Sequence, residues 1–243
     1  MTSESIGIWT ARWLEAHGIH HQYLPIAEST SALAHEEAFT APPVMVYVTD
    51  FQSAGRGRGE RVWVSPPQGD ALMATWSLAL SFAPQHLSAP IVGLHVYRAV
   101  REAWPQLKWS LKPPNDIYLK AGKAGGLLLE SLTRGADHRL LIGFGLNVRQ
   151  APGGVESATA IEGPDSLPTR PVSESEWQEF LHVLHHNLLQ AVTSVGSAVL
   201  DTHLRGELDA AIKIHPEAGK EFVGVTEQGD LVYKQGTVSW HNI

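Results

Sequence analysis

The sequence predicts an α+β fold, in which a mixed or antiparallel sheet is flanked by helices and a small β segment follows at the C-terminus. Segments with helical spacing and segments with strand alternation are mixed along the chain, without the regular repeat of a parallel α/β fold. The 243 residues, 43% of them hydrophobic, are enough to bury a core in one domain of about 200 residues plus an appendage. We therefore expect a main domain at 1–212 and a β-rich segment at 213–243.

The first fifty residues predict two helices and two strands. Apolar residues at helical spacing, followed by Gly18, indicate a helix over residues 5–17. The hydroxyl residues 29–31 precede a second helix at 32–39, and any one of them is able to cap it. The apolar runs at 20–26 and 44–48 indicate strands.

Residues 71–82 give the clearest strand pattern. Bulky side chains such as Trp76 alternate with smaller ones such as Thr75. One face should therefore pack a core, while the other leaves room for a helix or a ligand. Residues 88–104 then carry apolar side chains at helical spacing, and Pro105 ends this predicted helix.

Three further strands are expected near the middle of the chain. Residues 117–119 and 127–129 are joined by residues 120–123, whose composition indicates a hairpin turn. A strand at 140–148 contains Gly143 and Gly145. Glycines inside a strand mark either a bulge or a place where a ligand or another group comes close, and the sequence leaves both readings open.

The last third of the chain predicts a loop, two helices and a small sheet. Residues 151–172 are rich in Pro, Gly, Ser and Glu and indicate a surface loop. Helical spacing over 177–188 is followed by a second predicted helix at 198–212. Alternation over 221–240, with a turn at 228–230, indicates two or three short strands.

Charge and composition exclude several classes of function. The net charge of −7 argues against a broad nucleic-acid-binding face. The absence of cysteine excludes disulfides, thiolate zinc sites and cysteine nucleophiles. We see neither a secretory leader pattern nor an apolar run approaching about 20 residues. We therefore expect a soluble cytoplasmic protein that binds neither nucleic acid nor membrane.

Residues 55–63 are the most informative stretch of the sequence. Arg56, Arg58 and Arg61 lie here among three glycines, in a chain that is otherwise acidic. Glycine lets backbone N–H groups approach a ligand closely, and the arginine fork fits carboxylate or phosphate oxygens two at a time. The composition suits a loop that wraps an anion, although a solvated turn would have the same composition.

Two further clusters suggest the same chemistry. Residues 112–116, Lys-Pro-Pro-Asn-Asp, hold a lysine, an amide and a carboxylate on a stiff backbone. These groups could bind a nucleotide phosphate, a ribose or Mg²⁺, but the same residues also favour an ordinary turn. Lys123 precedes Gly125 and Gly126 at the predicted hairpin, where it could face a bound carboxylate or be a plain surface charge.

Taken together in this order, the clusters make the chain resemble the biotin protein ligases of the stand-alone type, without a DNA-binding domain. The resemblance covers roughly residues 26–150. It rests on the segments Glu28–Ser31, Thr49–Arg58, Arg61–Trp63, Lys112–Tyr118, Lys123–Glu130 and Gly143–Val148. It implies a class II synthetase-like fold of the biotin/lipoate ligase type, with the catalytic domain at 1–212 and a shortened C-terminal barrel at 213–243.

The resemblance also implies a reaction and its participants. Biotin would be attached to a lysine of a biotin carboxyl carrier protein domain in an ATP-dependent reaction through biotinyl-5′-AMP. ATP and Mg²⁺ would be required, biotin would be the substrate, and a homodimer is compatible with the family. Arg58 and Lys123 would be catalytic, because they would neutralise charge as the biotin carboxylate meets the α-phosphate.

The remaining site residues are carried over position by position. Mg²⁺ would be held by the ATP phosphates, with Asn115 and Asp116 as further ligands. ATP would contact Arg58, Arg61, Trp63, Lys112, Asn115, Asp116 and Asn147. Biotin would contact Ser29, Thr30, Ser31, Gln52, Gly55, Arg56, Gly57, Arg58, Trp63, Lys123 and Gly126.

Three positions depart from the family pattern. The family usually has tryptophan where Pro113 stands, often asparagine where Ser31 stands, and glycine where Glu60 stands. These departures keep two alternatives open. One is a lipoate or octanoate ligase of the same fold, although the arginine–glycine–glycine box of that group is absent. The other is a biotin or nucleotide sensor without turnover.

Overall fold

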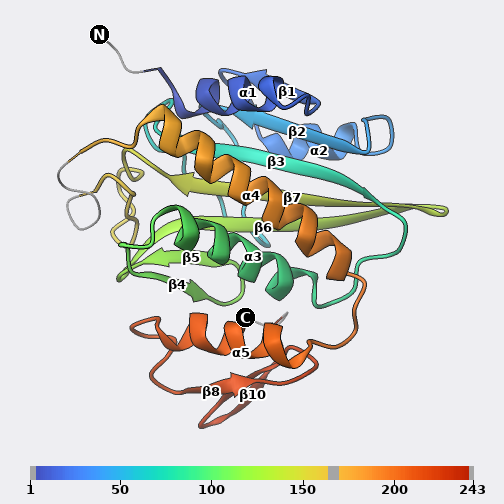
Figure 1. Ribbon diagram of the computed structural model, residues 1–243, viewed down its shortest axis with the longest axis vertical. Coiled ribbons are helices and arrows are strands. Elements are labelled where there is room, and N and C mark those ends of the chain that lie inside the picture. The colour runs from blue at the N-terminus through green and yellow to red at the C-terminus, as the bar shows by residue number, and fades with distance from the viewer. Residues whose placement is uncertain (1–3, 164–169, 241–243) are drawn as a thin grey trace.

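The computed structural model describes residues 4–163 and 170–240, and its main feature is a seven-stranded mixed sheet (Figure 1). The strand order is β1-β2-β3-β7-β6-β5-β4; β1 pairs parallel with β2, and the other neighbours are antiparallel. The strands are β1 His21–Leu24, β2 Val44–Thr49, β3 Ala71–Leu80, β4 Trp109–Lys112, β5 Asp116–Leu119, β6 Gly122–Arg134 and β7 Asp137–Asn147. This confirms the predicted α+β class.

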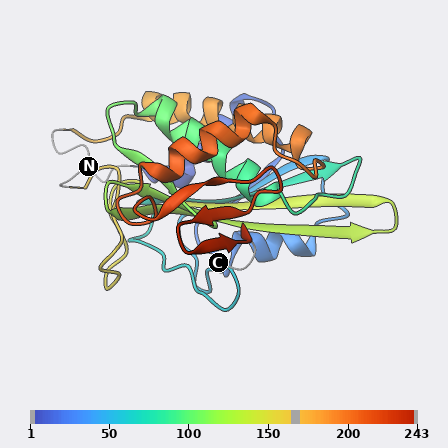
Figure 2. The same ribbon diagram turned by 90° about the horizontal axis from the view of Figure 1, so that it is seen from below.

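Helices cover the two faces of this sheet unequally. Helices α1 (Ile6–Ala16), α3 (Ser88–Ala103) and α4 (Glu174–Ser194) pack on one face, and the short α2 (Thr30–Glu36) packs on the other. Figure 2 shows α2 and the arginine-rich loop together on the second face. The second face is therefore only partly covered by a helix, and this is where the chain leaves space.

The two faces of β3 explain this division. Leu72, Trp76 and Leu78 belong to the main hydrophobic core under the three helices. The opposite face carries smaller side chains, and there Thr75 Oγ1 donates to Thr30 Oγ1 of α2 at 2.9 Å. Both faces of the strand are buried over residues 71–78. The prediction of a core face and a face with room for a helix is confirmed.

The C-terminal part forms a small separate sheet beside a helix. Helix α5 (Thr202–Lys213) contacts both α3 and β4, and it also contacts β8 (Phe222–Val225). Strands β9 (Leu231–Tyr233) and β10 (Gly236–Val238) complete a three-stranded antiparallel sheet. The predicted short strands are confirmed, whereas the domain boundary at residue 212 stays a prediction because α5 touches both parts.

Several element boundaries differ from the sequence-based expectations. The second helix begins at Thr30, because the N-cap residue Ser29 has an extended backbone, and it ends at Glu36. The Ser29 hydroxyl makes no capping hydrogen bond. Strand β4 was not predicted. Strand β6 is much longer than the predicted strand 127–129, and β7 begins before the predicted strand 140–148. The two strands form a long hairpin that turns at Gly135, where φ is +62°. Of the expected loop 151–172, residues 164–169 lie outside the described residues.

Within residues 4–163 and 170–240, no helix is both long and apolar enough to cross a membrane.

Candidate functional site

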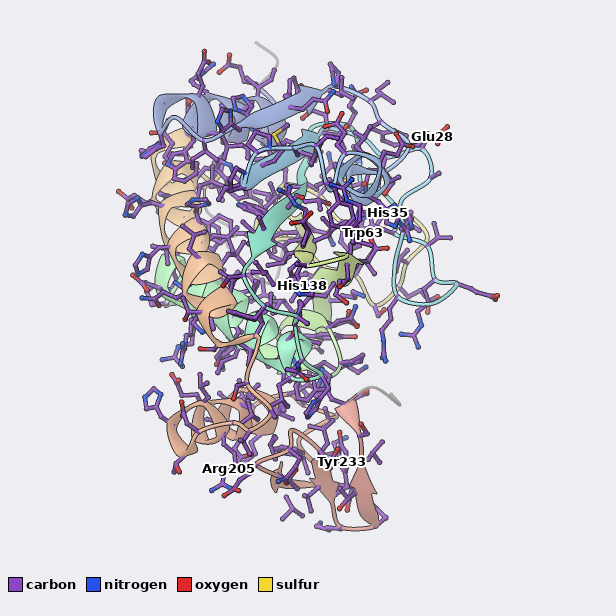
Figure 3. All side chains as sticks on the ribbon, turned by 90° about the vertical axis from the view of Figure 1, so that its right-hand side faces the viewer. Glu28, His35, Trp63, His138, Arg205 and Tyr233 are labelled. Atoms are coloured by element: carbon purple, nitrogen blue, oxygen red, sulfur yellow. The ribbon has the colours of Figure 1, made fainter. Side chains whose placement is uncertain are left out.

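A cavity of ≈ 130 Å³ lies on the sheet face that α2 leaves open. Strands β3, β6 and β7 form its floor, and the arginine-rich loop forms its rim. Figure 3 shows Trp63 of this loop on the side of the sheet away from α4. The cavity brings together most of the residues singled out in the sequence: Thr30, Ser31, Gln52, Arg56, Gly57, Arg58, Arg61, Trp63, Asn115, Asp116, Lys123 and Gly126.

One end of the cavity is polar but uncharged. Gln52 Oε1 accepts from the Thr30 backbone N–H at 2.8 Å and from Thr30 Oγ1 at 3.2 Å. Thr75 Oγ1 completes a short chain of hydroxyl groups with Thr30. Ser31, which also lines the cavity, shares a 2.9 Å hydrogen bond with Ser29. These linked donors and acceptors are preorganised to bind a neutral polar group in a low-dielectric site.

The apolar wall depends on Gly145 of β7. A Cβ placed on Gly145 would lie 2.5 Å from Trp63 Cζ2, so the indole occupies the space that any larger residue would need. The pairing of β7 with β3 runs without a register shift through Gly143 and Gly145. The glycines therefore mark a close approach rather than a bulge. The buried Trp63 Nε1 has no hydrogen-bond partner within the described residues.

The arginine-rich loop is closed on itself by backbone hydrogen bonds. The Gly57 N–H donates to Arg61 O at 2.8 Å, and the Trp63 N–H donates to Gly55 O at 3.0 Å. Gly59 at the tip has φ of +65°, a left-handed conformation that glycine adopts without a steric penalty. The loop thus forms a narrow flap with arginine side chains at its edges.

Two cationic groups of the cavity, those of Lys123 and Arg56, face carboxylates of the same chain. Lys123 Nζ lies 2.6 Å from Asp116 Oδ1, across the β5–β6 pair. Arg56 Nη2 lies 2.8 Å from Glu130 Oε1 of β6. Asn115 is fixed beside them, because its side-chain amide donates to Leu127 O at 2.5 Å and its own carbonyl accepts from the Leu127 N–H. The chain thus supplies internal anions where a ligand anion would bind.

Four of the expected site residues do not line this cavity. Ser29 and Gly55 are buried directly behind it. Lys112 lies outside the cavity, and its ammonium is 5.1 Å from the centre of the ring of Tyr118 on the neighbouring strand β5. The Asn147 side-chain amide donates to Thr159 O at 2.9 Å and so fastens the loop that follows β7. Roles for these four residues in binding stay predictions.

Sequence reasoning missed other residues of the cavity. Met73, Thr75 and Phe144 line it, as do Leu128 and Val62. The alternation along 71–82 had placed Met73 and Thr75 on the face expected to leave room for a helix or a ligand, but neither was named as a site residue. Val62 could not have been found this way, because its position depends on how the loop folds back on itself. Glu130 lay within the Lys123–Glu130 segment of the resemblance but carried no assigned role.

A second cavity of ≈ 200 Å³ adjoins the first and shares Arg58, Asn115, Leu127 and Leu128 with it. Trp240 forms part of its wall, and the Trp240 indole donates to Pro114 O at 2.7 Å. The turn that carries Asn115 is therefore held from outside by the C-terminal segment. The two cavities together provide one crevice along the sheet, with Arg58 between them.

Comparison with known proteins places this arrangement among relatives. Residues 23–147 match the model of the biotin/lipoate A/B protein ligase family. The chain is 34% identical over 143 residues to a bifunctional ligase/repressor of Bacillus subtilis, covering 57% of this chain and 43% of the relative. It is 34% identical over 150 residues to a biotin–[acetyl-CoA-carboxylase] ligase of Paracoccus denitrificans, covering 55% and 56%. The chain thus matches about half the length of these relatives.

The fold also matches a solved structure over nearly its whole length. The biotin protein ligase of Aquifex aeolicus, solved in complex with biotin and ATP, superposes with a TM-score of 0.67 at 23% identity. The match covers 90% of this chain and 94% of the Aquifex chain. At this level of identity the comparison confirms the predicted fold type.

Proposed function

Because this chain belongs to the biotin/lipoate A/B protein ligase family, we propose that it attaches biotin to a lysine of a carrier protein by way of biotinyl-5′-AMP, at the expense of ATP. One observation carries the proposal. Arg56, Arg58, Arg61 and Lys123 surround a single cavity whose far end is neutral and rich in hydrogen-bonding groups. A molecule with an uncharged polar head and a carboxylate tail fits such a cavity.

The neutral end suits the ureido group of biotin. A ureido group offers two N–H donors and one carbonyl acceptor. Thr30, Thr75 and the Gln52 side chain offer both donors and acceptors within one hydrogen-bonded chain. The apolar middle of biotin would then lie against Trp63 and Phe144, with the carboxylate directed to the cations. This pairing of neutral polar groups favours biotin over lipoate or octanoate, which have no ureido group.

The cations serve the first half-reaction. A biotin carboxylate oxygen attacks the α-phosphorus of ATP, the bond from that phosphorus to the β-phosphate oxygen breaks, and pyrophosphate leaves. The two reactants are both anions and repel each other, so groups that neutralise them where they meet lower the barrier. We assign this role to Arg58 and Lys123, whereas the flap at residues 55–63 excludes water from the mixed anhydride.

A magnesium ion fits this site as a companion of ATP. Mg²⁺ is typically held by one or two carboxylates together with substrate phosphates. Among the described residues no group of three His, Cys, Asp or Glu side chains could hold a metal alone. Asp116 and Asn115, on the shared wall of the cavity, would supply protein oxygens beside the phosphates. When bound, the ion would offset the negative charge of the triphosphate.

The second half-reaction needs little from the protein beyond positioning. The neutral amine of an acceptor lysine attacks the carbonyl carbon of the anhydride, the bond to AMP breaks, and the amine loses a proton to solvent. Because the anhydride is already activated, orientation of the amine accounts for most of the required acceleration. The partner would be a biotin carboxyl carrier protein domain.

The proposal is tested with a panel of acids. The protein is incubated with MgATP, a biotin carrier domain, and biotin, lipoate or octanoate in separate reactions, and the mass of the carrier is measured. We expect a mass increase with biotin alone. An increase with lipoate or octanoate would assign the chain to the other branch of the family. Biotin binding by calorimetry without any transfer would identify a sensor.

A further inference from the structure

Glu130 lies on β6, one of the strands under the cavity, and pairs with Arg56 of the flap. It lies on β6 two residues after Leu128 and four after Gly126, so its side chain is on the same face of the strand as these two cavity residues. Its two carboxylate oxygens accept from the two terminal nitrogens of Arg56 at 2.8 and 3.4 Å. The Glu130 side chain is 20% exposed and the Arg56 side chain is 45% exposed.

We propose that Glu130 is a positioning residue that holds Arg56 in the unliganded protein and releases it to an anionic ligand. The identity of that ligand, biotin, rests on the proposed function. Arginine binds a carboxylate through a pair of parallel N–H groups, and Glu130 engages both terminal nitrogens of Arg56. A ligand carboxylate that uses this fork must displace Glu130. The glutamate therefore acts as an internal competitor.

Because Arg56 lies within the flap, its contact with Glu130 affects the position of the whole flap. Arg56 forms an isolated antiparallel bridge with Val62, and the neighbouring Gly57 and Arg61 are joined by a backbone hydrogen bond. These bonds lie within the flap, and the flap is also held to the sheet where Trp63 packs against Gly145 of β7. The Arg56–Glu130 pair is a further link, because it joins the flap to β6 by a charged contact. The strength of this pair therefore affects how often the flap is closed in the absence of ligand.

Competition between Glu130 and the ligand for Arg56 links two measurable quantities, the frequency with which the flap opens and the affinity for the ligand. We call the Arg56–Glu130 pair the latch: the flap is latched when the pair is formed and open when it is broken. If the latched flap excludes the ligand carboxylate, the apparent dissociation constant equals that of the open form multiplied by one plus the ratio of latched to open molecules. Weakening the latch lowers this ratio. The flap then opens more often, and the ligand binds more tightly by a corresponding factor. A partly exposed arginine–carboxylate pair predicts about a two- to fivefold change in each quantity.

The test uses Glu130→Gln, which keeps the shape of the side chain and removes its charge. Hydrogen exchange of residues 55–63 in the unliganded variant should be about two- to fivefold faster than in the wild-type protein, and biotin should bind about two- to fivefold more tightly. Biotin methyl ester, which lacks the charge, should bind both proteins equally. Glu4→Gln serves as the control, because it removes an arginine–glutamate pair of 2.8 Å outside the cavity.

A second variant keeps the test decisive if the first is destabilised. The double variant Arg56→Glu with Glu130→Arg re-forms the pair with reversed polarity, so hydrogen exchange of the flap should return to the wild-type rate. Biotin should bind this variant more weakly than the wild-type protein, because Arg56 is no longer present. Unchanged exchange in Glu130→Gln, or biotin binding that is equal or weaker, would overturn the proposal. If neither the wild-type protein nor the variants bind biotin, the proposed function fails, and flap exchange still decides whether the latch exists.

Discussion

Replacing Lys123 with methionine separates a structural role from a catalytic one. The Lys123 ammonium lies 2.6 Å from Asp116 Oδ1, and the Asp116 side chain is only 15% exposed. Methionine keeps the unbranched stem but leaves this carboxylate without its cation. A group left unpaired in this way lowers the free energy of unfolding by about 1–3 kcal/mol. We therefore expect a less stable protein that still folds.

The catalytic loss should be larger than the stability loss and independent of it. Removing one preorganised electrostatic stabiliser slows a reaction by about 10²–10³-fold, or roughly 3–4 kcal/mol. Adding Asp116→Asn to Lys123→Met removes the unpaired charge, so the double variant should regain stability. The first half-reaction should stay slow, because no cation has returned. Lys108→Met, at an exposed lysine outside both cavities, is the control.

The free energy of unfolding and the rate of the first half-reaction can be measured on the same samples. Urea titration gives the free energy of unfolding, and a rapid-quench single turnover with saturating biotin and MgATP gives the rate of pyrophosphate release. An unchanged single-turnover rate in Lys123→Met would refute the catalytic role. Full recovery of that rate in the double variant would show that the slower reaction came from the unpaired Asp116 carboxylate. This result would also refute the catalytic role of Lys123.

Three further variants extend these predictions. Arg58→Ala should fold normally, as judged by circular dichroism, but release biotinyl-5′-AMP about 10²-fold faster, because Arg58 lines both cavities; slow release would contradict this. Gly145→Ala should displace the Trp63 indole and weaken biotin binding about tenfold or more by calorimetry, since the new Cβ would lie 2.5 Å from the ring; equal affinity would argue against this wall. Burial lowers the pKa of His95 to about 4, whereas the unfolded chain keeps the usual value of 6.5. The unfolded state therefore binds a proton first as the pH falls from 6.5 to 4, and urea titrations should show that the free energy of unfolding decreases by roughly 3 kcal/mol over this range. His95→Gln should lose less, and an identical pH profile would exclude His95 as the cause.

The sequence predicted the elements whose pattern is strong along one segment. The alternation over 71–82 and the helical spacing over 88–104 correspond to β3 and α3. The arginine loop, the 112–116 turn and Lys123 were also correctly expected to meet, although only the family resemblance linked segments so far apart. Strand β4 was missed because four residues ending at a proline pair give too short a pattern.

Side-chain direction was the part that the sequence could not supply. Lys112 and Asp116 face each other in register on β4 and β5, yet only Asp116 reaches the cavity. Lys112 lies instead over the ring of Tyr118 on β5, and that ring also contacts His215 of the C-terminal part. Asn147 is occupied by the loop carbonyl of Thr159. Each outcome depends on a contact with a residue outside the strand that carries the side chain, which the pattern along one strand does not encode.

In the proposed reaction, the flap and Lys123 bring a carboxylate and a phosphate together, and the flap then retains the product. The most direct measurement is a burst experiment without acceptor, in which the protein is mixed with excess labelled biotin and MgATP and then passed rapidly through a desalting column. We predict one equivalent of pyrophosphate per chain and one equivalent of biotinyl-5′-AMP that remains with the protein. No pyrophosphate, or an adenylate that emerges entirely in the small-molecule fraction, would contradict the claim.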